Sequence, residues 1–170
     1  LVQQIKPRLF YLYAQEENQD YIPIFARGLN TFSFAQLFRD NRFSGLDRTS
    51  DANQLSISIS NNFYDLENYR NIFNFSIGKI IYFEDRNISV DNETLYTRSN
   101  SNYIAEMEYR PKENISLIST FLYDSNADDQ KTVFNNHTFQ YRGKGNNIFN
   151  ASYRYSKNDI AQGDMSFAWE

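Results

Sequence analysis

Leu37-Phe-Arg-Asp-Asn-Arg-Phe-Ser-Gly-Leu-Asp-Arg-Thr-Ser-Asp-Ala-Asn-Gln-Leu-Ser-Ile-Ser-Ile-Ser60 is the stretch that decides the fold. A charged segment containing one glycine, residues 38–51, leads directly into strict alternation from Gln54 to Ser60. Apolar side chains fall on the odd positions and small uncharged polar side chains on the even ones. A period of two indicates a β-strand with one apolar face and one polar face.

The same alternation recurs along the whole chain. Eight segments carry it, and they lie near residues 2–14, 50–64, 69–83, 98–110, 115–124, 131–142, 147–156 and 163–170. Tight turns at 65–68, 111–114 and 143–146 alternate with longer polar connections at 15–49, 84–97, 125–130 and 157–162. This order predicts an all-β fold, an antiparallel up-and-down meander of about eight strands.

Composition limits the chemistry that the chain can perform. The net charge of -4 argues against nucleic acid as the main partner, because phosphate binding needs clustered Lys and Arg. The chain has no Cys, which excludes disulfides and thiolate metal sites in this stretch. Its one histidine, His137, argues against a histidine metal centre or a catalytic triad. We therefore expect no enzyme activity, no catalytic residue, no metal and no cofactor.

Alternation by itself does not say what each face meets. A soluble β-sandwich alternates with its apolar face turned inward, whereas a membrane barrel turns that face to lipid. Strands long enough to cross a bilayer, aromatic residues near strand ends, and short turns opposite long loops favour a partial wall of a large transmembrane β-barrel. Another outer-membrane barrel, such as a porin or plugged receptor, and a soluble β-sandwich binding module remain alternatives.

The barrel interpretation assigns each face of the predicted strands. Even-numbered polar side chains would face the lumen, and odd-numbered apolar side chains would face lipid. The expected lumen-facing residues are Gln54, Ser56, Ser58, Ser60, Glu106 and Glu108. The expected lipid-facing residues are Leu55, Ile57, Ile59, Phe73, Phe75 and Ile77. Lys79 and His137 interrupt the apolar columns, so the register is least defined near them.

The charges at the end of the long connection 15–49 alternate in sign. This pattern predicts an ion-pair network that fixes the loop, with Gly45 supplying a backbone conformation closed to other residues. Solvated loop charges, by contrast, would each contribute little. We expect an architectural or partner-binding role for the network. Its predicted residues are Phe38, Arg39, Asp40, Arg42, Gly45, Asp47, Arg48 and Asp51.

The same connection is rich in phenylalanine, which is unfavourable in water. We expect these side chains to pack under the loop and to fold it over or into a barrel mouth. Asn30-Thr31 is the predicted cap of a short helical turn that runs from Phe32 to Phe38. The phenylalanines concerned are Phe25, Phe32, Phe34, Phe38 and Phe43.

Several long strings resemble the LptD family of outer-membrane lipopolysaccharide-assembly proteins. They are Ile5-Lys-Pro-Arg8, then Phe38-Arg-Asp-Asn-Arg-Phe-Ser-Gly-Leu-Asp-Arg48, then Asp51-Ala-Asn-Gln54, and then Ser76-Ile-Gly-Lys-Ile-Ile-Tyr-Phe-Glu-Asp-Arg86. The resemblance covers residues 4–86 through these strings and reaches the end of the chain through strand pattern.

The resemblance implies a transport barrel in the outer membrane of a Gram-negative bacterium. It also implies three partners: lipopolysaccharide, a lipoprotein plug similar to LptE, and a periplasmic bridge that delivers the lipid through a jelly-roll domain. We expect residues 1–170 to form one internal segment of the barrel domain, without the jelly-roll and without the first and last strands that form the lateral gate. No gate residue can then be assigned in this chain.

Overall fold

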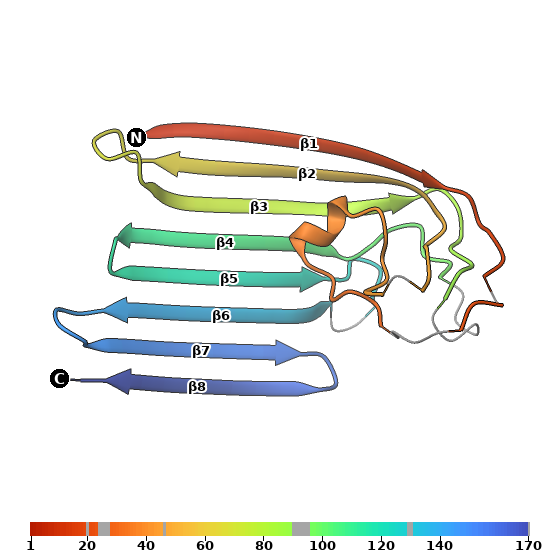
Figure 1. Cartoon of the computed structure of the whole chain (residues 1–170). Helices are drawn as coiled ribbons and strands as arrows, with labels where there is room; N and C mark the ends of the chain where they lie inside the picture. The colour runs from red at the N-terminus through yellow and green to blue at the C-terminus, as the bar shows by residue number, and fades with distance from the viewer. Residues whose placement is uncertain (20, 24–27, 46, 90–95, 129–130, 170) are drawn as a thin grey trace. The chain divides into compact units, whose positions relative to one another are not determined.

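The structure is a computed structural model of the 170-residue chain, and it describes residues 1–19, 21–23, 28–45, 47–89, 96–128 and 131–169. Eight strands form one sheet in the order β1 to β8, so that each strand lies beside its neighbours in sequence (Figure 1). The strands are β1 (Val2–Ala14), β2 (Ala52–Tyr64), β3 (Asn71–Tyr82), β4 (Tyr103–Lys112), β5 (Ile115–Tyr123), β6 (Thr132–Arg142), β7 (Ile148–Ser156) and β8 (Ile160–Ala168). The predicted all-β meander is confirmed.

The chain divides into two compact units, each described by itself. The strand unit consists of Leu1–Pro7, Ile59–Ile77 and Asn102–Glu170, and the loop unit consists of Arg8–Ser58 and Gly78–Ser101. The loop unit contains the one short helix of the described residues, the 3-10 helix η1 (Phe34–Phe38). None of the helical structure described is long and apolar enough to cross a membrane.

Antiparallel pairing in the strand unit aligns odd positions with odd positions. Leu117 of β5 pairs with Phe139 of β6, and Phe139 pairs with Ala151 of β7. Ala151 in turn pairs with Met165 of β8. Because side chains alternate along each strand, this register joins the apolar columns of β5 to β8 into one continuous face.

That apolar face is open in the strand unit. Its exposed large side chains, all at odd positions, are Ile59, Tyr109, Phe121, Tyr123, Phe139, Tyr141, Tyr153, Met165 and Phe167. The opposite face carries polar contacts: the Ser76 hydroxyl donates to Ser60 Oγ at 2.8 Å, and Asn74 Nδ2 donates to Asn62 Oδ1. The opposite face also carries exposed apolar side chains, Ile148 and Ile160, so the two faces of the described strand unit differ in composition without a strict division.

His137 keeps its place in the apolar column, so the register expected from alternation holds there. It pairs with Ser119 and with Tyr153 across the sheet. Its Nδ1 lies 3.0 Å from Ser119 Oγ, and its ring stacks on Tyr153 and meets the edge of Phe121. The imidazole is accommodated by a hydroxyl and two aromatic rings.

Two predicted boundaries are wrong. The fourth strand begins at Tyr103 rather than near residue 98, because the preceding residues bond to the end of β3: Ser101 N donates to Ile80 O, and Tyr82 N donates to Ser99 O. The last strand begins at Ile160, so the connection expected at 157–162 is a tight turn. Asn158 makes that turn possible with a φ of 64°, a conformation that asparagine tolerates.

Candidate functional site

Helix η1 lies over the polar face of β2 and β3 in the loop unit. Leu37 is fully buried there, and it is received by Gly78 of β3. A Cβ atom at Gly78 would lie 2.6 Å from Leu37 Cδ1 and 2.7 Å from the Ile57 carbonyl oxygen. The glycine is therefore required by close packing between the helix and the strands.

Phe38 of η1 is fixed by three neighbours. The Arg8 guanidinium lies 3.6 Å from the centre of the Phe38 ring, within cation–π range. The rings of Phe34 and Phe10 meet the ring edge-on at 5.9 Å and 6.3 Å. Phe43 is also buried and Phe32 is half-buried, whereas Phe25 lies outside the described residues.

The predicted cap of this turn is wrong. The helix begins at Phe34 with Ser33 as its N-cap residue, and no side chain caps it. Asn30 instead ties two parts of the connection together: its amide Nδ2 donates to Phe43 O at 2.9 Å, and its backbone N donates to Arg42 O. The asparagine side chain is thus occupied by a long-range contact rather than by the helix terminus.

Arg42 and Asp51 form the central ion pair of the loop unit, named here the Arg42–Asp51 clamp. Arg42 Nη2 lies 2.8 Å from Asp51 Oδ1, and the Asp51 side chain is 7% exposed. Arg42 Nη1 donates to the Asp51 carbonyl at 2.8 Å, and Nη2 also donates to Ile88 O. The Asp51 carboxylate further accepts the backbone N–H groups of Asn87 and Ile88.

The clamp joins the loop before β2 to the loop after β3. A buried carboxylate that accepts an arginine and two backbone N–H groups has its charge satisfied, which makes burial tolerable. Asn41 adds to this: its Nδ2 donates to Arg48 O at 2.8 Å, while its Oδ1 accepts from Phe43 N and Ser50 N. Gln19 closes a further reciprocal pair with the backbone of Thr49.

Arg86 is another arginine of the loop unit, and it is buried, with 7% exposed. Its guanidinium lies 3.5 Å from the centre of the Tyr82 ring and donates to the carbonyl oxygens of Tyr96 and Arg98. Burial lowers the pKa of Arg86, and the facing Tyr82 opposes that change. The site requires arginine rather than lysine, because only a planar guanidinium can stack on the Tyr82 ring and donate to two carbonyl oxygens at once.

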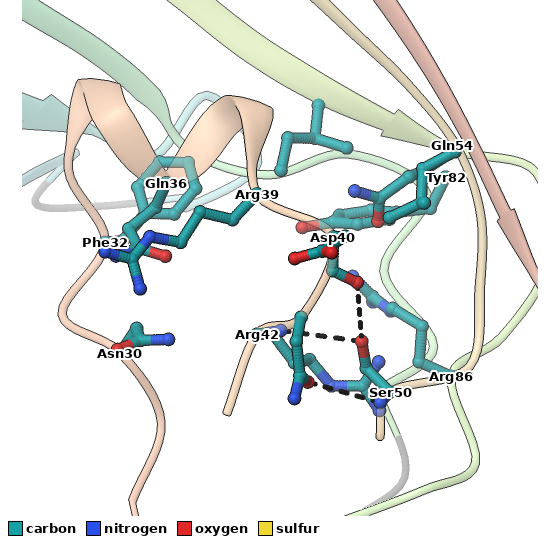
Figure 2. A pocket seen from close by; sticks show the side chains of 13 residues that line it. Asn30, Phe32, Gln36, Arg39, Asp40, Arg42, Ser50, Gln54, Tyr82 and Arg86 are labelled. Atoms are coloured by element: carbon teal, nitrogen blue, oxygen red, sulfur yellow. Dashed lines mark hydrogen bonds between the residues drawn. The ribbon is translucent and has the colours of Figure 1, made fainter. Parts of the chain in front are cut away.

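A cavity of about 80 Å³ lies among these groups (Figure 2). Ser50 bridges its wall: the hydroxyl donates to Asp40 O and accepts from Arg42 N. The cavity is lined by Leu12, Asn30, Phe32, Gln36, Arg39, Asp40, Asn41, Arg42, Ser50, Gln54, Ile80, Tyr82 and Arg86. Gln54 and Ser56, two of the expected lumen-facing residues, are buried on this side of the loop unit.

The charged network predicted from sequence is therefore brought together in part. Arg42 and Asp51 pair directly, Arg39 and Asp40 line the cavity, and Arg48 is buried while Asp47 is half-buried. The backbone expected at Gly45 stays a prediction, because the adjoining residue 46 lies outside the described residues.

The chemistry of the site is that of a scaffold. Within the described ranges, no group of three or more His, Cys, Asp or Glu side chains is placed to hold a metal ion. Arg42 and Asp51 instead form an ion pair and hydrogen bonds with backbone groups. Sequence reasoning missed Leu37, Gly78, Asn41 and Arg86 as members of this site, although the last three stand within strings that carry the family resemblance.

Comparison with known proteins now adds a decisive observation. Residues 1–169 match the family described as "LptD: LPS transport system D". The chain belongs to the LptD family. The match covers β1 to β8, so it extends well past the residues whose sequence strings first indicated this relationship.

Individual LptD relatives match most of the chain. The LPS-assembly protein LptD of Hahella chejuensis is 34% identical over 96% of this chain, and that of Ectopseudomonas mendocina is 38% identical over 95%. The LptD protein of Marinobacter nauticus is 41% identical over 72%. The chain spans about a fifth of the length of the curated relatives it matches, 16% to 20% in these three.

Proposed function

We propose that this chain is a section of the wall of an outer-membrane β-barrel that transports lipopolysaccharide and inserts it into the outer leaflet. Family membership supports this role, because the family is described as part of an LPS transport system. The role is transport, in which a wall guides a substrate without making or breaking covalent bonds. Membership also favours this barrel over a porin, a plugged receptor or a soluble sandwich module.

The observation that carries the proposal is the open apolar face of the strand unit. Several large side chains of β5 to β8 are exposed on that face, among them Phe121, Tyr153 and Met165. In water this arrangement is unfavourable by about 25 cal/mol for each Å² of apolar surface. A lipid environment removes that cost, and it leaves the polar face for the lumen.

The loop unit would shape the lumen of this barrel. Leu37 packs helix η1 against the polar face of β2 and β3, and the Arg42–Asp51 clamp ties the loop before β2 to the loop after β3. We propose that these loops narrow the lumen and form part of the surface that a lipoprotein plug similar to LptE contacts. The periplasmic bridge is a further partner, and we expect it to deliver lipopolysaccharide to the barrel through a jelly-roll domain.

Spin labels in the complete protein test which face meets lipid. Single cysteines are placed at Phe139 of the apolar column and at Thr138 of the polar column, in the protein reconstituted with its partner in bilayers. Oxygen, which concentrates in lipid, should relax the label at 139 more strongly. A water-soluble nickel chelate should relax the label at 138 more strongly. The reverse order, or equal water access at both positions, would contradict the proposal.

A further inference from the structure

A hollow lies on the polar face of the strand unit, near the tight turns that join β2 to β3, β4 to β5 and β6 to β7. Its volume is about 380 Å³, several times that of the cavity in the loop unit. Arginine and neutral polar side chains dominate its lining, which also includes one carboxylate, Glu113; the principal members are Arg70, Asn71, Arg110, Ser116, Gln140 and Arg142. None of the contacts that build the loop unit takes part in it.

The strand register explains why the sheet is hollowed here. Ser116 of β5 pairs with Gln140 of β6, so a small side chain stands beside a longer one. The pairing of β4 with β5 also shifts between Tyr109 and Lys112, which disturbs the ladder beside Ser116. A small floor residue between arginine-bearing strands leaves room for a ligand that reaches the guanidinium groups.

The arginines around the hollow differ in how firmly they are held. Arg70 is fixed: its Nη1 donates to Arg110 O at 3.1 Å and its Nη2 to Pro111 O at 2.9 Å. Its Nε and the Asn71 Oδ1 are buried without a hydrogen-bond partner. Arg110 is 53% exposed and pairs with Glu108 at 2.6 Å.

Arg142 is exposed, and its side chain has no ion pair or hydrogen bond recorded with the residues that the structure describes. Its backbone N donates to Asn114 O, which holds the end of β6 against the neighbouring turn. The hollow thus combines a fixed strand framework with a charged group that is available to a ligand.

We propose that this hollow binds a phosphate group on the headgroup of a phosphorylated glycolipid. Guanidinium groups match phosphate through paired N–H donors, and neutral amides and hydroxyls such as Gln140 and Ser116 suit sugar hydroxyls. The inference rests on the proposed function, which makes lipopolysaccharide the substrate. Since short turns of outer-membrane barrels face the periplasm, the site would lie at the periplasmic mouth of the lumen.

A photo-crosslinking residue at Gln140 tests the site in the complete protein with its partner, reconstituted in bilayers with purified lipopolysaccharide. A matched probe at Ser152, on the same polar face but outside the hollow, serves as the control position. We expect lipopolysaccharide to be captured at 140. The double variant R110Q/R142Q should weaken that capture tenfold or more, since about tenfold is the loss expected for a single charge-assisted hydrogen bond, and leave capture at 152 unchanged.

Two further arms identify the phosphate and the charge. Lipopolysaccharide stripped of its phosphates should be captured at 140 as weakly as in R110Q/R142Q, and millimolar inorganic phosphate should compete only if the hollow takes free phosphate as well. E108Q, which releases Arg110 from its ion pair, should raise capture at 140. Both variants alter partly exposed side chains, and heat-modifiable migration of the barrel verifies that they fold.

The outcomes separate the site from the function. Capture of lipopolysaccharide at 152 but not at 140, or capture at 140 that ignores phosphate removal and R110Q/R142Q, would overturn the site and leave transport intact. Capture of the partner protein in place of lipid at 140 would also overturn it, because the hollow would then be a protein contact. Absence of lipid capture at every wall position would contradict the proposed function itself.

Discussion

Replacing Gly78 by alanine should release helix η1 from the polar face of the loop unit. The added methyl carbon would lie 2.6 Å from Leu37 Cδ1, 2.7 Å from the Ile57 carbonyl oxygen and 2.9 Å from Ser58 Cβ. The first contact can be relieved by rotation of a side chain, whereas the second involves backbone and cannot. Overpacking of this kind costs roughly 1–3 kcal/mol.

Hydrogen exchange of the complete protein measures the effect. If the cost falls on the docking of η1, the open population rises about tenfold for each 1.4 kcal/mol, and amides of residues 34–45 exchange correspondingly faster. Gly163→Ala is the matched control, because a Cβ there meets only the Ser152 carbonyl at 3.8 Å. Both glycines lie in strands, so any general effect of alanine on strand stability is the same in the two variants and cancels when their exchange rates are compared.

A double variant locates the strain. Leu37→Ala alone removes a fully buried side chain and should increase exchange across the same segment. Combined with Gly78→Ala, it removes one clash and leaves the contact with the Ile57 carbonyl, so the joint effect should be smaller than the sum. Wild-type protection in Gly78→Ala, or strict additivity with Leu37→Ala, would refute the close packing of helix against strand.

Three further substitutions test other parts of the chain. Asp51→Asn should loosen the loop unit by about 1.5–3 kcal/mol, since the carboxylate loses its charge-assisted bond to Arg42, and faster proteolysis of the β1–β2 connection reports it. Arg86→Lys should not restore the stacked, forked contacts, so proteolysis of the β3–β4 connection should match that of the alanine variant. Phe139→Arg should destabilise the folded barrel in bilayers by about 2–4 kcal/mol at the midplane, whereas Thr138→Arg is tolerated; equal effects would refute the assignment of faces.

The strands could be predicted because their signal is local. Alternation depends on neighbours two positions apart, and the pairing of Leu117 with Phe139 and Ala151 follows once alternation and tight turns fix the register. Strand boundaries were less predictable where residues outside the strand form other backbone hydrogen bonds or turn the chain. Ser101 bonds to the end of β3, which delays the start of β4, and Asn158 turns the chain earlier than its polar surroundings suggested.

The loop site could be predicted only in its charged half. The alternating signs in residues 39–51 predicted an ion-pair network, and the structure pairs Arg42 with Asp51. The remaining partners of Asp51 are backbone groups of Asn87 and Ile88, more than 30 residues away. Nearly every residue has a backbone N–H group, so the residue types around Asp51 do not predict which backbone donors it binds.

The sequence of β3 does contain a signal that the loop unit covers part of its polar face, and the same signal can be sought in related sequences. The even-numbered column of β3 changes from polar to small, apolar and then aromatic side chains at Gly78, Ile80 and Tyr82. Two of these positions have a covering partner in the loop unit, Leu37 at the glycine and Arg86 on the tyrosine ring, and the isoleucine between them is buried. A lumen-facing column needs polar side chains only where water reaches it. A run of small, apolar or aromatic residues in such a column therefore marks the part of the strand that an inward-folded loop covers.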